Sequence, residues 1–364
     1  MIIKDITNYI EDLAPLNYAE EFDNVGLLVG NYNTKVSGIL VTLDTLEQTI
    51  EEAIAKKCNL IVSFHPIIFG GLKKLNGSSY VERVVLKAIK NDIAIYATHT
   101  ALDNSKNGVS AKMSEILGLQ NTKVLIPKKG IIKKLTTYVP INNSDSLKDS
   151  LFLAGAGNIG NYDHCSFTIL GNGTYKGNEE SNPVLGKKGK LHTEKEIKIS
   201  VIYESKYEGA ILEALKENHP YEEVAYEIVR TENVHQNIGM GMIGELSSEM
   251  HEKDFLLYLK KTMKTDCVRH SALINKKIKK VAVLGGSGSF AISNAKKAGA
   301  DAYISADFKY HEFFKAENSI LLADIGHYES EQFTKNLLVD YLTKKFSNFA
   351  VILSEKSTNP IYYI

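Results

Sequence analysis

The chain has 364 residues, enough for two or three domains with sizeable hydrophobic cores. It carries 43 lysines and arginines against 43 aspartates and glutamates, and this zero formal charge argues against a general nucleic-acid-binding or membrane-surface protein. Cys58, Cys165 and Cys267 are far apart and form no Cys-x-x-Cys pair, so they indicate neither a disulfide framework nor a thiolate zinc site.

The first third of the chain alternates between predicted strands and helices. This alternation predicts right-handed βαβ units and a mainly parallel sheet. The first residues contain no signal-peptide apolar region, and no apolar run reaches the ~20 residues of a membrane span, so we expect a cytoplasmic protein. The predicted elements are a helix at Ile6–Leu13, strands at Val36–Leu43, Asn59–Ser63 and Ile93–Ala97, and helices at Leu46–Lys57, Tyr80–Lys90 and Val109–Leu117.

A change in composition near Pro127–Gly130 predicts a linker, and the segment after it has a different order of elements. The order βαββαβ is that of a ferredoxin-like unit, so residues 130–232 are predicted to form an inserted domain. The glycine- and asparagine-rich segments Gly155–Asn161 and Gly171–Gly186 are expected to be loops. The predicted elements are strands at Leu135–Val139, Cys165–Leu170, Ile197–Tyr203 and Val224–Val229, and helices at Ser146–Ala154 and Tyr207–Asn218.

The α/β alternation resumes after the insert, so residues 1–126 and 237–364 are predicted to be two α/β halves of one core. The last helix is expected to run without a break from about Tyr328 to Lys345. The other elements are helices at Asp254–Lys264 and Phe290–Ala298, and strands at Lys280–Leu284, Ala302–Ser305, Ile320–Asp324 and Ala350–Leu353.

Three predicted strands end in residues that can bind a metal ion. His65 follows one strand, His99 and Asp103 follow another, and His327 and Glu331 follow a third at the start of a helix. The carboxyl ends of parallel strands gather at one edge of a sheet, and a spacing of four places two side chains on one helix face. Nitrogen and oxygen donors of this kind suit Zn, Mn, Fe or Co. The alternative for each residue is a hydrogen-bonded polar group at the end of an element.

Two further stretches carry polar groups near predicted strand ends. The loop Gly285–Ser289 lies between a strand and a helix, where its amides could bind an anion, although a tight turn explains it equally well. Lys309 and His311 follow another strand and could contact a phosphate or donate a proton; otherwise they are solvated loop residues.

These stretches together resemble the NIF-three-like family, whose bacterial members are often labelled GTP cyclohydrolase I type 2 homologues. The insert resembles that of the longer members through Ala154–Tyr162 and His219–Glu222. The matching stretches in the two halves are Phe22–Gly30, Ser63–Pro66 with Phe69, Thr98–Asp103, Gly244–Leu246, Gly285–Ser289, Asp307–His311 and Gly326–Glu331.

The resemblance implies two NIF-three-like halves around a two-metal site holding Zn, Mn or Fe. The family ligands fall on His65, Asp103, His327 and Glu331, with Glu331 as the bridge and His99 as a further candidate ligand. The resemblance also implies a toroidal homohexamer with an inserted domain similar to the P-II/CutA trimerising fold.

Phe64 is a departure from the family pattern, because many bacterial members carry a histidine there. Phenylalanine cannot ligate, so one metal loses a nitrogen donor. Either the second site is weaker or empty, or His99 or water takes the place.

The resemblance implies a metal-dependent hydrolase of the GTP cyclohydrolase I type 2 kind, in which water attacks the purine ring and formate is released. We expect His99 and His311 to transfer protons and Lys309 to contact the triphosphate of a nucleotide substrate. The alternatives are a metal-dependent nucleotide or phosphoester hydrolase, and a metal-binding hexameric scaffold or regulator with little catalysis.

Overall fold

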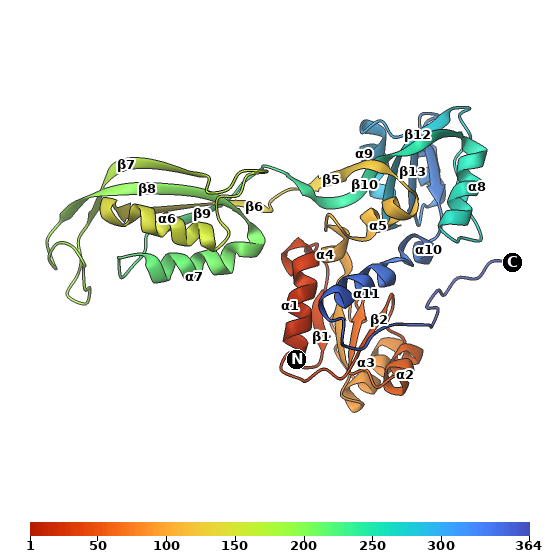
Figure 1. Ribbon diagram of the computed structural model, residues 1–364, viewed down its shortest axis with the longest axis horizontal. Coiled ribbons are helices and arrows are strands. Elements are labelled where there is room, and N and C mark those ends of the chain that lie inside the picture. Colours follow the sequence, from red (N-terminus) through yellow and green to blue (C-terminus); the bar gives the residue numbers. More distant parts are fainter. The chain divides into compact units, whose positions relative to one another are not determined.

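Three β-sheets organise the chain in the computed structural model, which describes residues 1–364 (Figure 1). The chain divides into one unit made of residues 1–127 and 236–364 and a second unit made of residues 128–235. The first unit contains a five-stranded and a six-stranded sheet, and the second contains a four-stranded sheet.

The five-stranded sheet is mostly parallel and is covered on both faces. Its strands β2, β3 and β4 are buried along their whole length, as expected for a parallel sheet between two helical layers. Helices α1 (Ile3–Leu13) and α11 (Thr334–Lys345) contribute to one core, and α2 (Glu47–Ala55) and α3 (Tyr80–Lys90) to the other. The strand order is β1 (Gly26–Val29), β4 (Ala94–Ala97), β3 (Leu60–Ser63), β2 (Ile39–Thr42) and β15 (Val351–Leu353).

The six-stranded sheet has a parallel centre with antiparallel neighbours. Strands β12, β13 and β14 are parallel, whereas β10 and β11 pair with this centre antiparallel. Helices α5 (Val109–Ile116) and α8 (Glu252–Thr262) pack on one face, and α9 (Ile292–Lys297) packs on the other. The strand order is β11 (Arg269–His270), β14 (Leu321–Asp324), β13 (Ala302–Ala306), β12 (Lys277–Ser287), β10 (His235–His251) and β5 (Gln120–Lys128).

Several local features differ from the predictions. Part of the predicted linker belongs to strand β5, and β1 pairs antiparallel with β4. The predicted last helix is two helices, α10 (His327–Glu331) and α11, separated by Gln332 and Phe333. After α11 the chain returns to the first sheet, where β15 pairs with β2.

The second unit consists of β6 (Ile132–Pro140), α6 (Ser144–Leu153), β7 (Ser166–Tyr175), β8 (His192–Glu204), α7 (Glu208–Asn218) and β9 (Tyr226–Arg230). Its strands lie in the order β7, β8, β6, β9, and the paired strands are antiparallel. Both helices cover the same face of this sheet (Figure 1). Their leucine and isoleucine side chains, with those of β6 and β8, form the core of the unit.

Strand β7 is longer than predicted. It continues through Gly171 and Gly173 to Tyr175, inside a stretch that the glycine content predicts to be a loop. A side chain at Gly173 would place its Cβ 2.0 Å from Glu196 Oε2 on the adjacent strand, so a larger residue there would displace the Glu196 carboxylate. Cross-strand packing therefore outweighs the low strand propensity of glycine.

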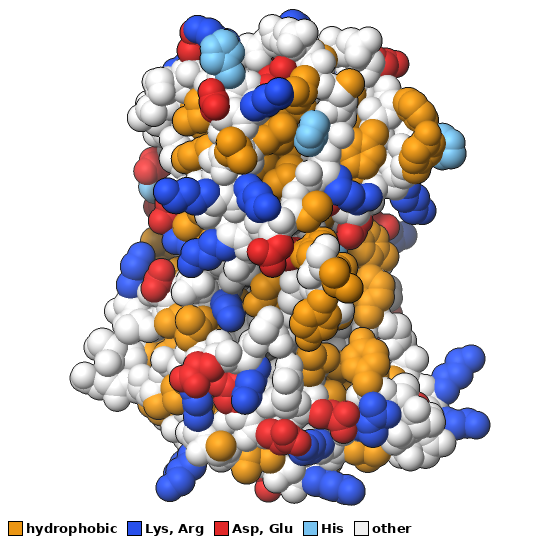
Figure 2. Space-filling model, turned by 90° about the vertical axis from the view of Figure 1, so that its right-hand side faces the viewer, with side chains coloured by type: hydrophobic (Ala, Val, Ile, Leu, Met, Phe, Trp, Pro, Cys, Tyr) orange, Lys and Arg blue, Asp and Glu red, His pale blue; other side chains and the backbone are white.

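No helix of the structure is both long and apolar enough to cross a lipid bilayer. Figure 2 shows a face on which lysine and arginine side chains are interspersed with aspartate and glutamate, with hydrophobic side chains between them. This face therefore carries no extended patch of one charge.

Candidate metal centre

Polar side chains from both sheets of the first unit meet beyond the carboxyl ends of their strands. His65 lies just after β3 and Asp44 just after β2, whereas His327 begins α10 after β14. Asp307 directly follows β13. Sites in open α/β sheets form at this edge, because parallel strands end there side by side.

His65, His327 and Glu331 form the centre of this site. Glu331 Oε2 lies 3.1 Å from His65 Nε2 and 3.3 Å from His327 Nε2. One potential ligand atom from each of the three residues lies within 4.8 Å of the other two. Glu331 is only 3% exposed, and its buried Oε2 accepts no hydrogen bond of normal geometry. A buried carboxylate oxygen between two imidazole nitrogens fits a divalent cation.

The two histidines are each oriented by an aspartate. Asp44 Oδ1 lies 2.8 Å from His65 Nδ1, and Asp307 Oδ2 lies 2.7 Å from His327 Nδ1. Asp44 is itself fixed, because Thr358 Oγ1 donates to its Oδ2 at 2.5 Å. A carboxylate that accepts the Nδ1 proton directs Nε2 towards a metal ion and strengthens it as a ligand. This pairing therefore presents both Nε2 atoms to the side where Glu331 lies.

Opposite charges and burial shift the pKa values of these three groups. Burial would lower the pKa of His65, but Asp44 and Glu331 raise it to about 10. Burial would likewise lower the pKa of His327, but Asp307 and Glu331 raise it to about 11. Burial would raise the pKa of Glu331, but His327 and His65 lower it to about 2. A cation that binds all three groups must therefore replace the protons on the two imidazole rings.

Gly285 and Gly286 allow α10 to approach β12 closely. A Cβ at Gly286 would lie 2.4 Å from Glu331 Oε1, and Gly286 has a φ of +67°. The Gly286 amide donates to Ser330 Oγ at 2.8 Å, and the Gly288 amide donates to the Ala306 carbonyl. Two amides of the predicted anion-binding loop are therefore already bonded to the protein, and the glycines serve close packing beside Glu331.

His99 lies next to the cluster but outside it. Its Nδ1 lies 2.7 Å from Asp23 Oδ1, and its ring centroid is 5.5 Å from that of His65. Its Nε2 forms no hydrogen bond in the structure. His99 is thus held by a carboxylate with one nitrogen free.

Asp103 and Phe64 occupy the same region. Burial, followed by the negative charge of Glu331, raises the pKa of Asp103 well above its usual value. Asp103 is not part of the three-residue group, although it feels the charges of all three members. Phe64 is fully buried in the hydrophobic core, with its ring centroid 4.9 Å from that of His65.

Lys309 and His311 are exposed on the segment after β13. His311 contacts the rings of Tyr310 and Phe314, and neither Lys309 nor His311 forms an ion pair or hydrogen bond with the three-residue group.

The sequence reasoning missed Asp44, Asp307 and Asp23 as partners of the three histidines. Asp44 and Asp307 each follow a buried strand, as His65 does, and this position in the sequence is the feature that points to them. Asp23 lies in a loop, and nothing in the spacing of the sequence connects it with His99.

Comparison with known proteins gives consistent results over the whole chain. The family model Duf34/NIF3 (NGG1p interacting factor 3) matches residues 1–360. A Bacillus subtilis protein named "GTP cyclohydrolase 1 type 2 homolog" is 37% identical over 99% of this chain and 98% of its own length. A relative of the same name from Halalkalibacterium halodurans is 35% identical with the same coverage.

Solved structures agree with this match. A Bacillus cereus protein related to NIF3 aligns with a TM-score of 0.83 and 34% identity, covering 100% of this chain and 99% of that one. A Staphylococcus aureus protein aligns with a TM-score of 0.78 and 29% identity, with the same coverage.

Proposed function

The chain belongs to the Duf34/NIF3 family, and from this premise we propose that it is a metal-dependent hydrolase with His65, His327 and Glu331 as metal ligands. The observation that carries the proposal is Glu331 Oε2, which is buried, accepts no hydrogen bond and faces two imidazole nitrogens. When bound there, a divalent ion supplies the Lewis acidity that makes water a nucleophile near neutral pH.

Asp103 extends this proposal to a second ion. Its carboxylate and that of Glu331 repel each other in a buried place, as the raised pKa of Asp103 reflects. A cation between two carboxylates removes this repulsion, so Asp103 and a bridging Glu331 would hold the second ion.

The names of the relatives favour a purine nucleotide as the substrate, with ring opening and formate release as the reaction. His99 is the first candidate for proton transfer, because Asp23 fixes its Nδ1 and leaves Nε2 unbonded beside the cluster. Asp44 and Asp307 keep the metal-binding histidines oriented during the reaction. Lys309 and His311 remain candidates for contacting the phosphates and donating a proton, since both follow β13 next to Asp307.

The experiment that tests this function measures two products on one sample. The purified chain is loaded with Zn, Mn or Fe and given GTP, and both formate and inorganic phosphate are followed. Formate release that is lost in His99→Ala and kept in His251→Ala, a change at an exposed histidine, supports the proposal. Unchanged rates in Lys309→Ala and His311→Ala would remove these two residues from the mechanism.

A second candidate function is a metal-binding scaffold or regulator with little turnover. Phe64 favours it, because this fully buried side chain beside His65 offers no ligand atom. Absence of both products from the metal-loaded chain would support this function, whereas phosphate without formate would indicate a phosphoester hydrolase.

We also propose that residues 128–235 are a ferredoxin-like domain and that the protein forms a homohexamer. The order βαββαβ and the strand order β7, β8, β6, β9 support the first point. Phe167 and Val229, which are 68% and 56% exposed, lie on the uncovered face of that sheet, and an assembly would bury them. Light scattering coupled to size-exclusion chromatography measures the number of chains directly.

A further inference from the structure

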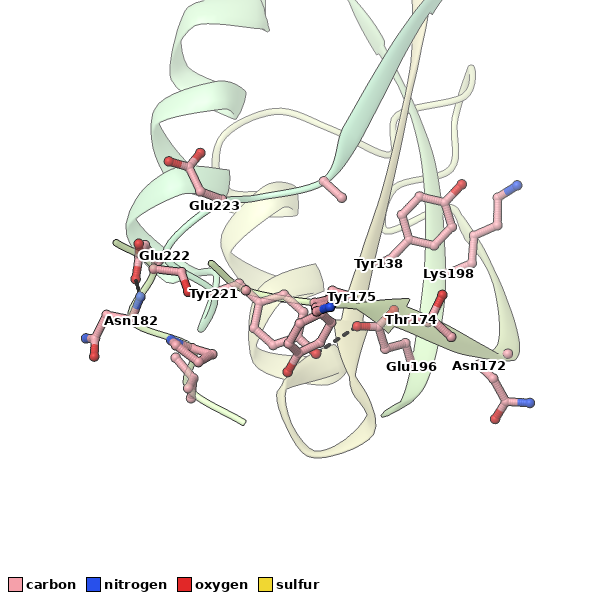
Figure 3. A pocket seen from close by; sticks show the side chains of 18 of the residues that line it. Tyr138, Asn172, Thr174, Tyr175, Asn182, Glu196, Lys198, Tyr221, Glu222 and Glu223 are labelled. Atoms are coloured by element: carbon pink, nitrogen blue, oxygen red, sulfur yellow. Dashed lines mark hydrogen bonds between the residues drawn. The ribbon is translucent and has the colours of Figure 1, made fainter. Parts of the chain in front are cut away.

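The uncovered face of the β7-β8-β6-β9 sheet contains a cavity of about 570 Å³, which is within the usual size range of small-molecule sites. Gly171 lies opposite Glu196 in the β7–β8 register. A Cβ at Gly171 would meet nothing within 4 Å, so β7 leaves open space there, next to the Glu196 carboxylate that lies against Gly173. The loop that carries Asn182 and the segment after Tyr221 form another wall (Figure 3).

A buried carboxylate faces this cavity. Glu196 is 8% exposed, accepts a hydrogen bond from Tyr221 Oη at 2.7 Å and forms no ion pair. Burial and the nearby Glu196 raise the pKa of Tyr221, so its phenol stays protonated and donates. Buried carboxylates normally have a cationic partner, and this one has none within the chain.

Aromatic rings stand next to this carboxylate. Tyr175 and Tyr221 lie side by side there, with ring centroids 5.8 Å apart (Figure 3). Tyr175 Oη donates to the carbonyl of Leu185, which fixes its ring. Tyrosine faces attract cations, and this attraction is strongest where water is excluded.

The charges that line the cavity also favour a cation. Glu196, Glu222 and Glu223 outnumber Lys176 and Lys198. Lys198 projects from the same face of β8 as Glu196, yet its ammonium lies over the ring of Tyr138, 5.8 Å from the centroid. The lysine of β8 that shares a face with Glu196 therefore leaves this carboxylate free for a ligand.

We propose that this cavity binds an organic ammonium ion, with its charged nitrogen at Glu196 beside the rings of Tyr175 and Tyr221. The ammonium donates a charge-assisted hydrogen bond to Glu196 Oε2. An apolar body attached to the nitrogen lies along Ile169 and Val184, which also line the cavity. This site belongs to the second unit alone and does not depend on the metal centre.

Three probes of nearly equal size test the proposal by isothermal titration calorimetry on the full chain. They are 2-phenylethylammonium, the neutral 2-phenylethanol and the anionic 3-phenylpropionate. We expect the ammonium to bind at least about tenfold more tightly than the alcohol, and the carboxylate not to bind, because the charge pairs with Glu196. The proposal is overturned if the ammonium and the alcohol bind equally well or if the carboxylate binds more tightly. It is also overturned if the ammonium does not bind at about 10 mM, roughly the weak end of specific recognition.

Two variants locate the site. Glu196→Gln keeps the acceptor for Tyr221 and removes the charge, so it should weaken ammonium binding at least about tenfold. Glu213→Gln, a change at an exposed position of α7, is the matched control and should leave binding unchanged. Gly171→Val fills the open space at Gly171 in the cavity wall while keeping the Glu196 carboxylate, and it decides the question if Glu196→Gln lowers the melting temperature. Ammonium binding that survives both Glu196→Gln and Gly171→Val would contradict the proposal.

Discussion

His65 Nε2 and Glu331 Oε2 lie 3.1 Å apart, although His65 follows a strand of the first sheet and Glu331 ends a short helix that follows the second. This contact joins the two sheets of the first unit at one point. The other ring nitrogen of His65, Nδ1, pairs with Asp44, and Glu331 Oε2 accepts no hydrogen bond of normal geometry.

Removing the charge of Glu331 should abolish tight metal binding. Glu331→Gln keeps the size of the side chain and removes the anionic oxygen that faces both histidines. We expect the dissociation constant for Zn to rise by more than the ~100-fold typical of losing an outer-shell partner. Glu329→Gln is the control, because Glu329 lies on the same helix and is equally buried but bonds to Asn359. Equal affinities of the two variants would exclude Glu331 as a ligand.

Loss of the aspartates that orient the histidines should weaken metal binding measurably, but less than loss of a ligand does. Asp44→Asn and Asp307→Asn each remove the charge that accepts the Nδ1 proton. We expect each to weaken metal binding by roughly 10–100-fold. Asp12→Asn, at an exposed position of α1, should have no effect. Competition with a fluorescent chelator measures all three, and wild-type affinity in both test variants would show that the aspartates do not orient the ligands.

Gly286 should tolerate no side chain. Gly286→Ala places a Cβ 2.4 Å from Glu331 Oε1, at a φ that costs a non-glycine residue about 1–2 kcal/mol. We expect both a lower free energy of unfolding and a loss of metal affinity, because Glu331 must move. Gly70→Ala is the matched control, since a Cβ there meets nothing within 4 Å. Unfolding in urea with and without Zn separates the two effects, and a variant with normal metal binding would show that Glu331 is not held by this contact.

His219 should make the second unit less stable in acid. Its Nε2 donates to the Tyr138 carbonyl, and its Nδ1 accepts from the Tyr221 amide, so the neutral ring fits. Burial lowers the pKa of His219 below 6.5 in the folded chain. The unfolded chain therefore binds the proton more readily than the folded chain. The contribution of His219 to the free energy of unfolding is complete above pH 6.5 and is lost as the pH falls below this value.

The variant His219→Gln tests this effect. Glutamine can still donate to Tyr138 but does not titrate, so we expect a loss of about 1 kcal/mol at pH 7.5 that shrinks at pH 5.5. Thermal unfolding of wild type and variant is measured at both pH values. Because other groups titrate alike in the two proteins, their contribution cancels in the difference between the two free energies of unfolding. A difference that grows in acid would mean that the charged ring is the stabilised form.

The strand-end histidines could be identified from the sequence because parallel strands bring their carboxyl ends together whatever the rest of the chain does. Asp44 and Asp307 could not be singled out, since an aspartate after a strand more often stabilises a turn. The pairing of β15 with β2 could not be predicted from the sequence either, because a three-residue strand does not specify which sheet it joins. The extension of β7 through Gly171 and Gly173 was also hidden, because it comes from pairing with β8, which is distant in the sequence.

Elemental analysis of the purified chain shows whether His65, His327 and Glu331 bind a divalent ion. The chain is dialysed against Zn, Mn or Fe and then against buffer alone, alongside the variants His65→Ala and His327→Ala. We expect at least one ion per wild-type chain, since three ligands hold one ion, and none in either variant. A wild-type chain without bound metal, or variants with the same metal content as wild type, would contradict this expectation.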